Sequence, residues 1–141
     1  MFKKILVAYD DSKGGKLALT GAAALAQHDG SEVTALWVQE PLPRYSDLPG
    51  EPEDQAESSE YYFQKRSKEV EAVAAQWKIT IACVTRRGHA AKTIVTFALE
   101  EGYDLIVLGH SDHSALWGRL LGDIADRVCD HSHCSVLVMK Q

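Results

Sequence analysis

The sequence predicts an α/β protein: a single domain with an open, five-stranded, mostly parallel sheet and helices on both faces. Short apolar runs bounded by charge alternate with helical segments from one end of the chain to the other, which is the pattern of βαβ units with right-handed crossovers. The 141 residues suit one domain, spanning residues 1–141. An apolar content of 45% is ordinary for a globular protein.

The first two strands flank an alanine-rich helix. Lys3–Tyr9 is an apolar run bounded by charge, as expected of a strand that is covered on both faces. Asp11 or Ser12 can cap the helix that follows, Gly14–Gln27. The small residues of this helix would let it sit close to the sheet. The second strand is Glu32–Gln39.

The middle of the chain contains a long polar stretch, Glu40–Ser59 (residues 40–59), which holds all four prolines and a cluster of acids. It has no periodic apolar pattern, so we expect a mobile loop rather than a domain linker. The next segment, Glu60–Trp77, is amphipathic at helical spacing. A third strand is expected over Lys78–Thr85.

The last part of the chain repeats the strand and helix pattern. A glycine turn at Gly88 precedes the remaining elements, which are a helix over Ala90–Glu101, a strand over Leu105–Leu108, a helix over Asp123–Asp130 and a strand over Ser135–Met139. The final run, Val136–Met139, is apolar and would be exposed at the edge of the sheet. We therefore expect a homodimer that forms through this strand.

Charge and composition argue against several classes of partner. The net charge of −5 gives no sequence-wide basic surface for nucleic acid and would repel anionic lipid. No apolar run approaches the roughly 20 residues that a membrane span needs. The start of the chain lacks the features of a signal peptide. We expect a cytoplasmic protein without nucleic-acid or membrane partners, and the three cysteines do not indicate a disulfide framework.

A ligand site is expected at the carboxyl edge of the sheet. In wound sheets, ligands bind beyond the carboxyl ends of the strands, where the strand order reverses. This rule brings together Asp10, the end of the second strand near Val38, the Gly88 turn and the loop after Gly109. A strand that ends in glycine, followed by a helix that opens near Gly122, is suited to hold an anion. The simpler alternatives are that the glycines only form turns and that Asp10 only caps a helix.

Catalytic and metal-binding signals are weak. His110 and His113, with the segment CDHSHC near the end of the chain, suggest zinc only superficially, because no second ligand pair stands at a matching spacing. We therefore expect no metal site. The sequence has neither a nucleophile elbow nor a Walker lysine, so we do not expect an enzyme. A weak metal-dependent phosphohydrolase that uses Asp10, His110 and Asp112 is the remaining catalytic alternative.

Three segments resemble a known family along essentially the whole chain: ILVAYDDS, GHAAKTIVTFALEEGYDLIVLG and GRLLGDIADRVCDHSHCSVLVM. They are similar to the universal stress protein family (UspA-like). The resemblance implies a parallel five-stranded sheet of the adenine nucleotide alpha hydrolase-like kind, which is usually dimeric. It also implies a nucleotide-responsive binding and signalling module in the stress response. Some members of the family bind ATP and others do not.

The phosphate motif of the ATP-binding members is altered here. That motif is a glycine, two residues, a second glycine, nine residues, and a glycine followed by Ser or Thr. Gly109 and Gly122 match its first and third glycines, but Asp112 and Asp123 stand at the second glycine and at the hydroxyl residue. Two unit charges about 4 Å apart repel by about 4 kcal/mol at an effective dielectric near 20, although a bridging Mg²⁺ would reverse the sign.

The candidate ligands are therefore ATP or AMP, with or without Mg²⁺, and adenosine, AMP or a metal-assisted ligand fits better than a bare triphosphate. The resemblance implies that Asp10 lies on the ribose and metal side and Val38 on the adenine side. The alternative within the family is a member without a nucleotide that acts through dimerisation and protein contacts. The predicted cofactor-binding residues are Ala8, Tyr9, Asp10, Val38, Gly88, Leu108, Gly109, His110, Asp112, Gly122, Asp123 and Ile124.

Overall fold

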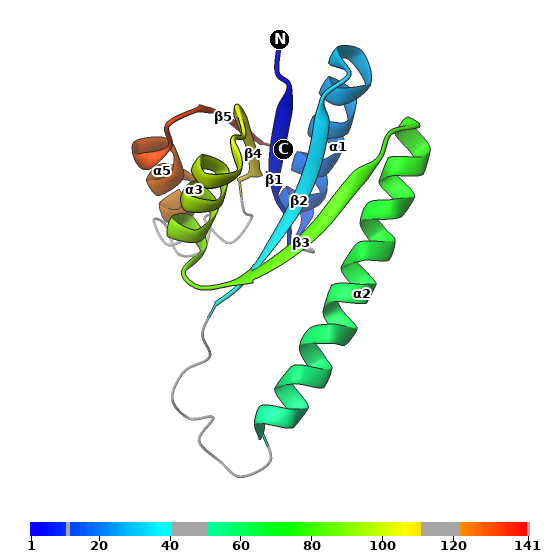
Figure 1. Ribbon diagram of the computed structural model, residues 1–141, viewed down its shortest axis with the longest axis vertical. Coiled ribbons are helices and arrows are strands. Elements are labelled where there is room, and N and C mark those ends of the chain that lie inside the picture. The colour runs from blue at the N-terminus through cyan, green and yellow to red at the C-terminus, as the bar shows by residue number, and fades with distance from the viewer. Residues whose placement is uncertain (11, 41–50, 111–121, 141) are drawn as a thin grey trace.

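The computed structural model describes residues 1–10, 12–40, 51–110 and 122–140, of which residues 51–58, 122 and 123 are described by their backbone. Five parallel strands form one sheet in the order β3-β2-β1-β4-β5 (Figure 1). This arrangement confirms the predicted fold class. The elements in chain order are β1 (Lys4–Ala8), α1 (Lys13–Asp29), β2 (Glu32–Gln39), α2 (Glu51–Trp77), β3 (Ile81–Arg87), α3 (Ala90–Glu101), β4 (Leu105–Gly109), α5 (Gly122–His131) and β5 (Ser135–Met139).

The strand order places β1 at the centre of the sheet. Ile5 of β1 pairs with Val33 of β2 on one side and with Leu105 of β4 on the other. The chain winds outward from β1 to β2 and β3, then returns to the other side of β1 for β4 and β5. The strand order therefore reverses between β1 and β4, and their carboxyl ends border the expected ligand crevice.

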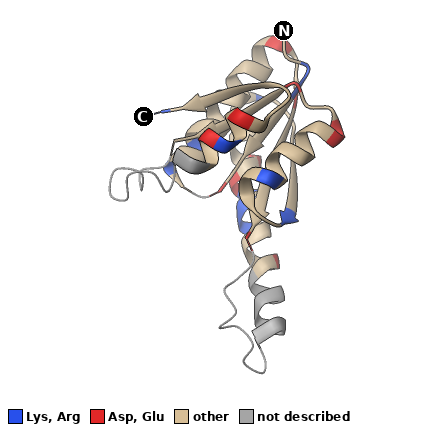
Figure 2. Cartoon of the chain, turned by 90° about the vertical axis from the view of Figure 1, so that its left-hand side faces the viewer, with Lys and Arg blue, Asp and Glu red and all other residues tan. Residues whose placement is uncertain are grey.

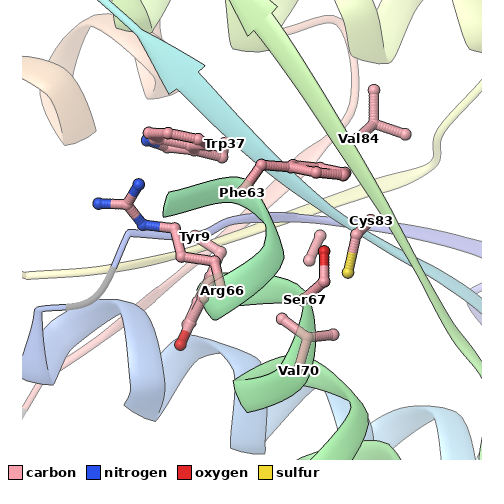
Figure 3. Close-up of a pocket in the computed structure, with 9 residues that line it drawn as sticks. Tyr9, Trp37, Phe63, Arg66, Ser67, Val70, Cys83 and Val84 are labelled. Carbon is pink, nitrogen blue, oxygen red and sulfur yellow. The ribbon is translucent and has the colours of Figure 1, made fainter. Parts of the chain in front are cut away.

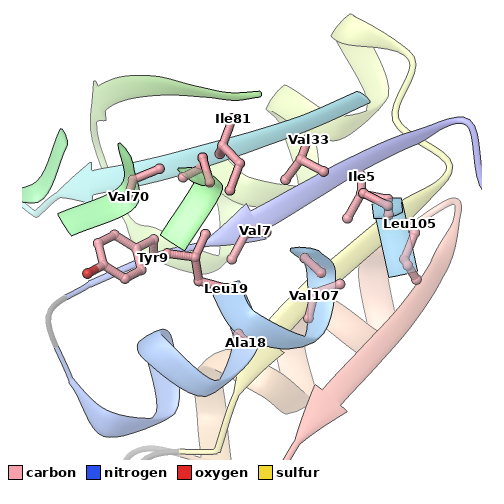
Figure 4. Packing of buried hydrophobic residues seen from close by; sticks show 14 residues of the cluster. Ile5, Val7, Tyr9, Ala18, Leu19, Val33, Val70, Ile81, Leu105 and Val107 are labelled. Carbon is pink, nitrogen blue, oxygen red and sulfur yellow. The ribbon is translucent and has the colours of Figure 1, made fainter. Parts of the chain in front are cut away.

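Helices cover both faces of the sheet, and each face has its own apolar core. α1 and α2 cover one face, where Ile5, Val7 and Val107 pack against Leu19 and Val70 (Figure 4). α3 and α5 cover the other face, over residues that alternate with the first set along the same strands. Burial on both faces explains why β1 and β4 are continuously apolar in the sequence.

Local capping explains where α1 begins and ends. Of the two predicted caps, Ser12 is the N-cap: its Oγ accepts a hydrogen bond from the Gly15 N–H at 3.0 Å. Asp11 lies outside the described residues. At the other end, Gly30 has a left-handed φ of 73° and its N–H donates to the Ala26 carbonyl.

Helix α2 begins at Glu51 rather than at Glu60, so the prediction of a loop over residues 51–59 is wrong. Pro52 falls in the first turn, where the missing N–H would have no intrahelical partner. The segment also contains several good helix formers (Glu, Gln, Ala), and its acids suit the positive end of the helix dipole. A search for apolar periodicity detects neither property. Residues 41–50 of the predicted loop lie outside the described residues.

Strand β3 covers Ile81–Arg87, whereas the sequence predicted Lys78–Thr85. The start was wrong because Lys78 adopts a left-handed φ of 57° and the Ile79 N–H still bonds to α2, at the Ala74 carbonyl. The end was wrong because β2 provides pairing partners for both arginines, Arg86 and Arg87. The remaining bounds agree with the predictions to within two residues.

Charged residues of both signs are interspersed on the side of the molecule shown in Figure 2. None of the described helices combines the length and the apolar character that crossing a bilayer requires.

Candidate functional site

An apolar floor lies at the carboxyl edge of the sheet, on the face that α3 and α5 cover. Four of the predicted cofactor-binding residues build it: Leu108 is buried in this core, and Ala8, Val38 and Ile124 are partly buried against it. They come from the ends of β1, β2 and β4 and from the first turn of α5. Residues distant in sequence thus converge on one surface beside the point where the strand order reverses.

Asp10 is exposed and lies two residues after the end of β1. Its Oδ1 accepts hydrogen bonds from the Ser12 N–H, at 3.0 Å, and from the Ser12 hydroxyl. Ser12 in turn caps α1, so Asp10 orients the cap rather than forming it. Among the described residues, Oδ2 of Asp10 has no hydrogen-bond partner, which leaves this oxygen for a ligand.

The glycines around this edge are required by close backbone packing. A Cβ added to Gly109 would lie 2.0 Å from the Gly14 carbonyl oxygen, and one added to Gly14 would lie 2.8 Å from the His110 carbonyl oxygen. A Cβ on Gly15 would meet the Asp10 carbonyl oxygen at 2.5 Å. The start of α1 therefore rests directly on the end of β4. The paired glycines of α1 were the sequence signal for this contact, because glycine is unfavourable inside a helix.

The backbone N–H of His110 is used inside the sheet. It donates to the Met139 carbonyl of β5 at 2.8 Å. The sequence argument required free N–H groups in the loop after Gly109, and the first N–H after that glycine is not one of them. Asp112 lies outside the described residues. Gly122 and Asp123 form the start of α5, as expected.

Tyr9 differs from the other predicted residues because its side chain lies on the opposite face of the sheet. The ring is buried in the core beneath α1 and α2, and the hydroxyl donates to Glu69 Oε2 of α2 at 2.7 Å. The Tyr9 N–H donates to the Leu36 carbonyl. Tyr9 therefore joins the end of β1 to α2, and its ring does not contact the apolar floor.

Gly88 forms the turn between β3 and α3. Its φ of 148° falls in the region that favours glycine, and an added Cβ would meet Thr93 Oγ1 at 2.6 Å. Its N–H donates to the Gln39 carbonyl, one residue beyond Val38. The turn thus lies beside the end of β2 and brings the start of α3 next to the apolar floor.

A small pocket lies on the other face, between the sheet and α2 (Figure 3). Its volume is about 10 Å³, the room that one water molecule needs. The Arg66 guanidinium lies over the Trp37 ring, 3.9 Å from its centroid. Burial raises the pKa of the Cys83 thiol, which lines the same pocket. This pocket is too small for a nucleotide, and sequence reasoning gave no signal for the Trp37–Arg66 contact.

The model of the universal stress protein family matches residues 1–140. Universal stress protein MJ0531 of Methanocaldococcus jannaschii is 33% identical over 143 residues, which cover 100% of this chain and 84% of that protein. The solved structure of the hypothetical protein MJ0577 superposes with a TM-score of 0.83 at 26% identity, covering 100% of this chain and 97% of the other.

Two more distant structures share the fold and contain a nucleotide. One is a universal stress protein in complex with cAMP, with a TM-score of 0.73, 22% identity, and coverage of 98% of this chain and 96% of the other. The second is a universal stress protein family protein from Arabidopsis thaliana with AMP bound, with a TM-score of 0.71, 15% identity, and coverage of 99% and 92%. Because the family model covers nearly the whole sequence and a close relative spans all of it, the chain belongs to the universal stress protein family.

Proposed function

We propose that this protein is a nucleotide-responsive binding and signalling module of the stress response, and that it binds an adenine nucleotide at the edge between β1 and β4. The observation that carries the proposal is the convergence of the apolar floor (Ala8, Val38, Leu108 and Ile124) with the Asp10 carboxylate. An apolar surface with a few well-placed polar groups is the usual chemistry of a small-molecule site. The adenine lies on the floor and the ribose reaches Asp10.

The number of phosphates is limited by charge. Asp112 and Asp123 stand where the family motif has a glycine and a hydroxyl residue. Each added phosphate raises the repulsion from these carboxylates, so we propose AMP as the preferred ligand and ATP as a ligand that requires Mg²⁺. The relatives with cAMP and AMP bound support this proposal, since their fold accommodates an adenine ring with one phosphate.

Isothermal titration calorimetry with AMP, ADP, ATP and cyclic AMP, each with and without Mg²⁺, tests the proposal. We expect the affinity without Mg²⁺ to fall from AMP to ATP. Asp10→Asn should weaken AMP binding by at least tenfold, because a hydrogen bond to a charged group contributes roughly 1.5–3 kcal/mol. Asp126→Asn is the matched control, since it removes the same charge from an exposed position on α5.

Restoring the family motif tests the role of the two acids. The double variant Asp112→Gly/Asp123→Ser should bind ATP at least tenfold more tightly than the unmodified protein in the absence of Mg²⁺. AMP affinity should change less, since AMP carries fewer charges. If neither protein binds any of the four nucleotides, the nucleotide proposal is wrong, and the alternative of a member that acts only through dimerisation and protein contacts is left.

We also propose that the protein forms a homodimer through β5. This strand is an edge of the sheet, and Val136, Leu137, Val138 and Met139 are all only partly buried. Leu137→Glu should shift the protein to the monomer in analytical ultracentrifugation. Leu99→Glu is the control, because Leu99 is 58% exposed on α3, away from the edge. Equal sedimentation of both variants and the unmodified protein as dimers would place the interface elsewhere.

A further inference from the structure

A second opening lies at the carboxyl ends of β2 and β3, on the face that α2 covers. It is a groove of about 440 Å³, a volume within the usual range of small-molecule sites. The strands contribute Gln39, Thr85, Arg86 and Arg87, and α2 contributes Ser59, Glu60 and Phe63. Phe63 also lines the small pocket beneath Trp37 (Figure 3), so the two openings share this side chain.

The two arginines of β3 point to opposite faces of the sheet. The Arg86 guanidinium lies 5.2 Å from the centroid of the Phe97 ring of α3, and its Nη1 donates to the Thr85 carbonyl at 2.8 Å. Arg86 therefore belongs to the face covered by α3 and α5. Because side chains alternate along a strand, Arg87 lies on the α2 face together with Thr85. Gln39 is the register partner of Arg87 on β2 and lies beside it.

The groove brings together two opposite charges that the described ion pairs do not include. Arg87 and Glu60 are both exposed and border the same groove from different elements. A direct surface pair between them would add little stability. A ligand that carries both charges therefore competes with a weak interaction.

Two further features give the groove chemical selectivity. The Thr85 hydroxyl oxygen is buried and has no hydrogen-bond partner among the described residues, which is unusual for a buried polar atom. The Phe63 ring supplies an apolar wall beside it. The groove therefore offers a cation, an anion and an aromatic surface to a ligand.

We infer that this groove binds a small zwitterion with an apolar side chain, of the α-amino acid type. The ligand carboxylate pairs with the Arg87 guanidinium, the ammonium pairs with Glu60, and the apolar part packs on Phe63. The site is separate from the proposed nucleotide site, because Val38 lies in the core beneath α3 and α5 and the groove lies on the α2 side.

Titration of the full chain with three related probes tests this inference by two-dimensional ¹H–¹⁵N NMR. L-Phenylalanine carries both charges, phenethylamine lacks the carboxylate and 3-phenylpropionate lacks the ammonium. We expect L-phenylalanine to bind at least tenfold more tightly than either analogue and to shift the amide signals of Gln39, Thr85 and Arg87. Saturating AMP should leave this affinity unchanged, so failure here is distinguishable from failure of the nucleotide proposal.

Matched variants separate the groove from nonspecific charge effects. Arg87→Met should reduce L-phenylalanine affinity to that of phenethylamine, and Glu60→Gln should reduce it to that of 3-phenylpropionate. Arg127→Met removes the same charge from an exposed position on α5, outside the groove, and should leave binding unchanged. Far-ultraviolet circular dichroism and urea midpoints verify that the variants fold. Equal affinity for the three probes, no binding of any probe at about 10 mM, roughly ten times a millimolar Kd, or equal losses in Arg127→Met and Arg87→Met would each overturn the inference.

Discussion

The substitution Gly109→Ala tests whether the end of β4 is shaped by packing or by a ligand. An added Cβ would lie 2.0 Å from the Gly14 carbonyl oxygen, 2.2 Å from its carbonyl carbon and 2.5 Å from its Cα. All three are backbone atoms of α1, so no side-chain rotation relieves the overlap. The first turn of α1 would have to move by roughly 1 Å or more to reach an ordinary contact distance.

The expected loss of stability follows from this overlap. Overpacking a core costs about 1–3 kcal/mol, and a contact between two backbones belongs at the upper end, at about 3 kcal/mol. For a domain of this size, that corresponds to a fall in Tm of roughly 10 °C. Gly21→Ala is the control. Its Cβ would meet only the flexible tip of Met139, at 3.0 Å from Cε, and alanine gains about 1 kcal/mol of helix propensity, so the net change should stay within about 1 kcal/mol.

Urea unfolding followed by circular dichroism, without nucleotide, measures both variants. If the contact between α1 and β4 constrains Gly109, then Gly109→Ala lowers the urea midpoint strongly in the ligand-free protein. If its midpoint equals that of the unmodified protein while AMP binding is lost, then Gly109 is retained for the ligand, and the close approach of α1 and β4 does not constrain it.

Three further predictions concern single contacts. Tyr103→Phe removes a buried hydrogen bond, 2.8 Å long, from the Tyr103 hydroxyl to Thr34 Oγ1. It should lower the free energy of unfolding by about 1–2 kcal/mol in urea titrations. A double-mutant cycle with Thr34→Val should show coupling between the two sites. Asp104→Ala should lower the free energy of unfolding by about 1–3 kcal/mol. The Asp104 carboxylate accepts hydrogen bonds from two backbone N–H groups at the start of β1, at 2.8 and 3.0 Å. An unchanged urea midpoint would show that water replaces these bonds. Burial raises the pKa of the Cys83 thiol, and only the thiolate reacts. Iodoacetamide at pH 8 should therefore alkylate Cys83 more slowly than the exposed Cys129. Mass spectrometry that finds Cys83 modified first would contradict this prediction.

The sequence predicted those elements whose signal is local. The bounds of β2, α3 and β5 agree with the structure because apolar runs, glycine ends and helical spacing mark them directly. It failed at two boundaries, for different reasons. β3 extends through two arginines only because β2 continues beside it, and α2 begins early in a segment that has no apolar periodicity but good helix-forming composition.

The candidate site shows the same division. The strand-end rule brought Asp10 and Val38 to one edge, and the structure places both there. Because side chains alternate along a strand, Tyr9 is expected on the face opposite Ala8. The rule could not foresee its bond to Glu69, because this depends on where α2 docks. It also could not foresee that the N–H of His110 is taken by β5, because strand register is a long-range property.

The two edge strands of the sheet, β3 and β5, differ in a way that limits how copies of the chain can pair. β5 presents a partly buried apolar strand, whereas β3 ends in the exposed residues Arg86 and Arg87. If two copies paired through β5 about a twofold axis, β3 would be the edge strand at both ends of the joined sheet. The positive charges of Arg86 and Arg87 would oppose the addition of further strands there. In the proposed dimer, growth by edge pairing would therefore stop at two copies, and the same asymmetry would oppose the formation of fibres.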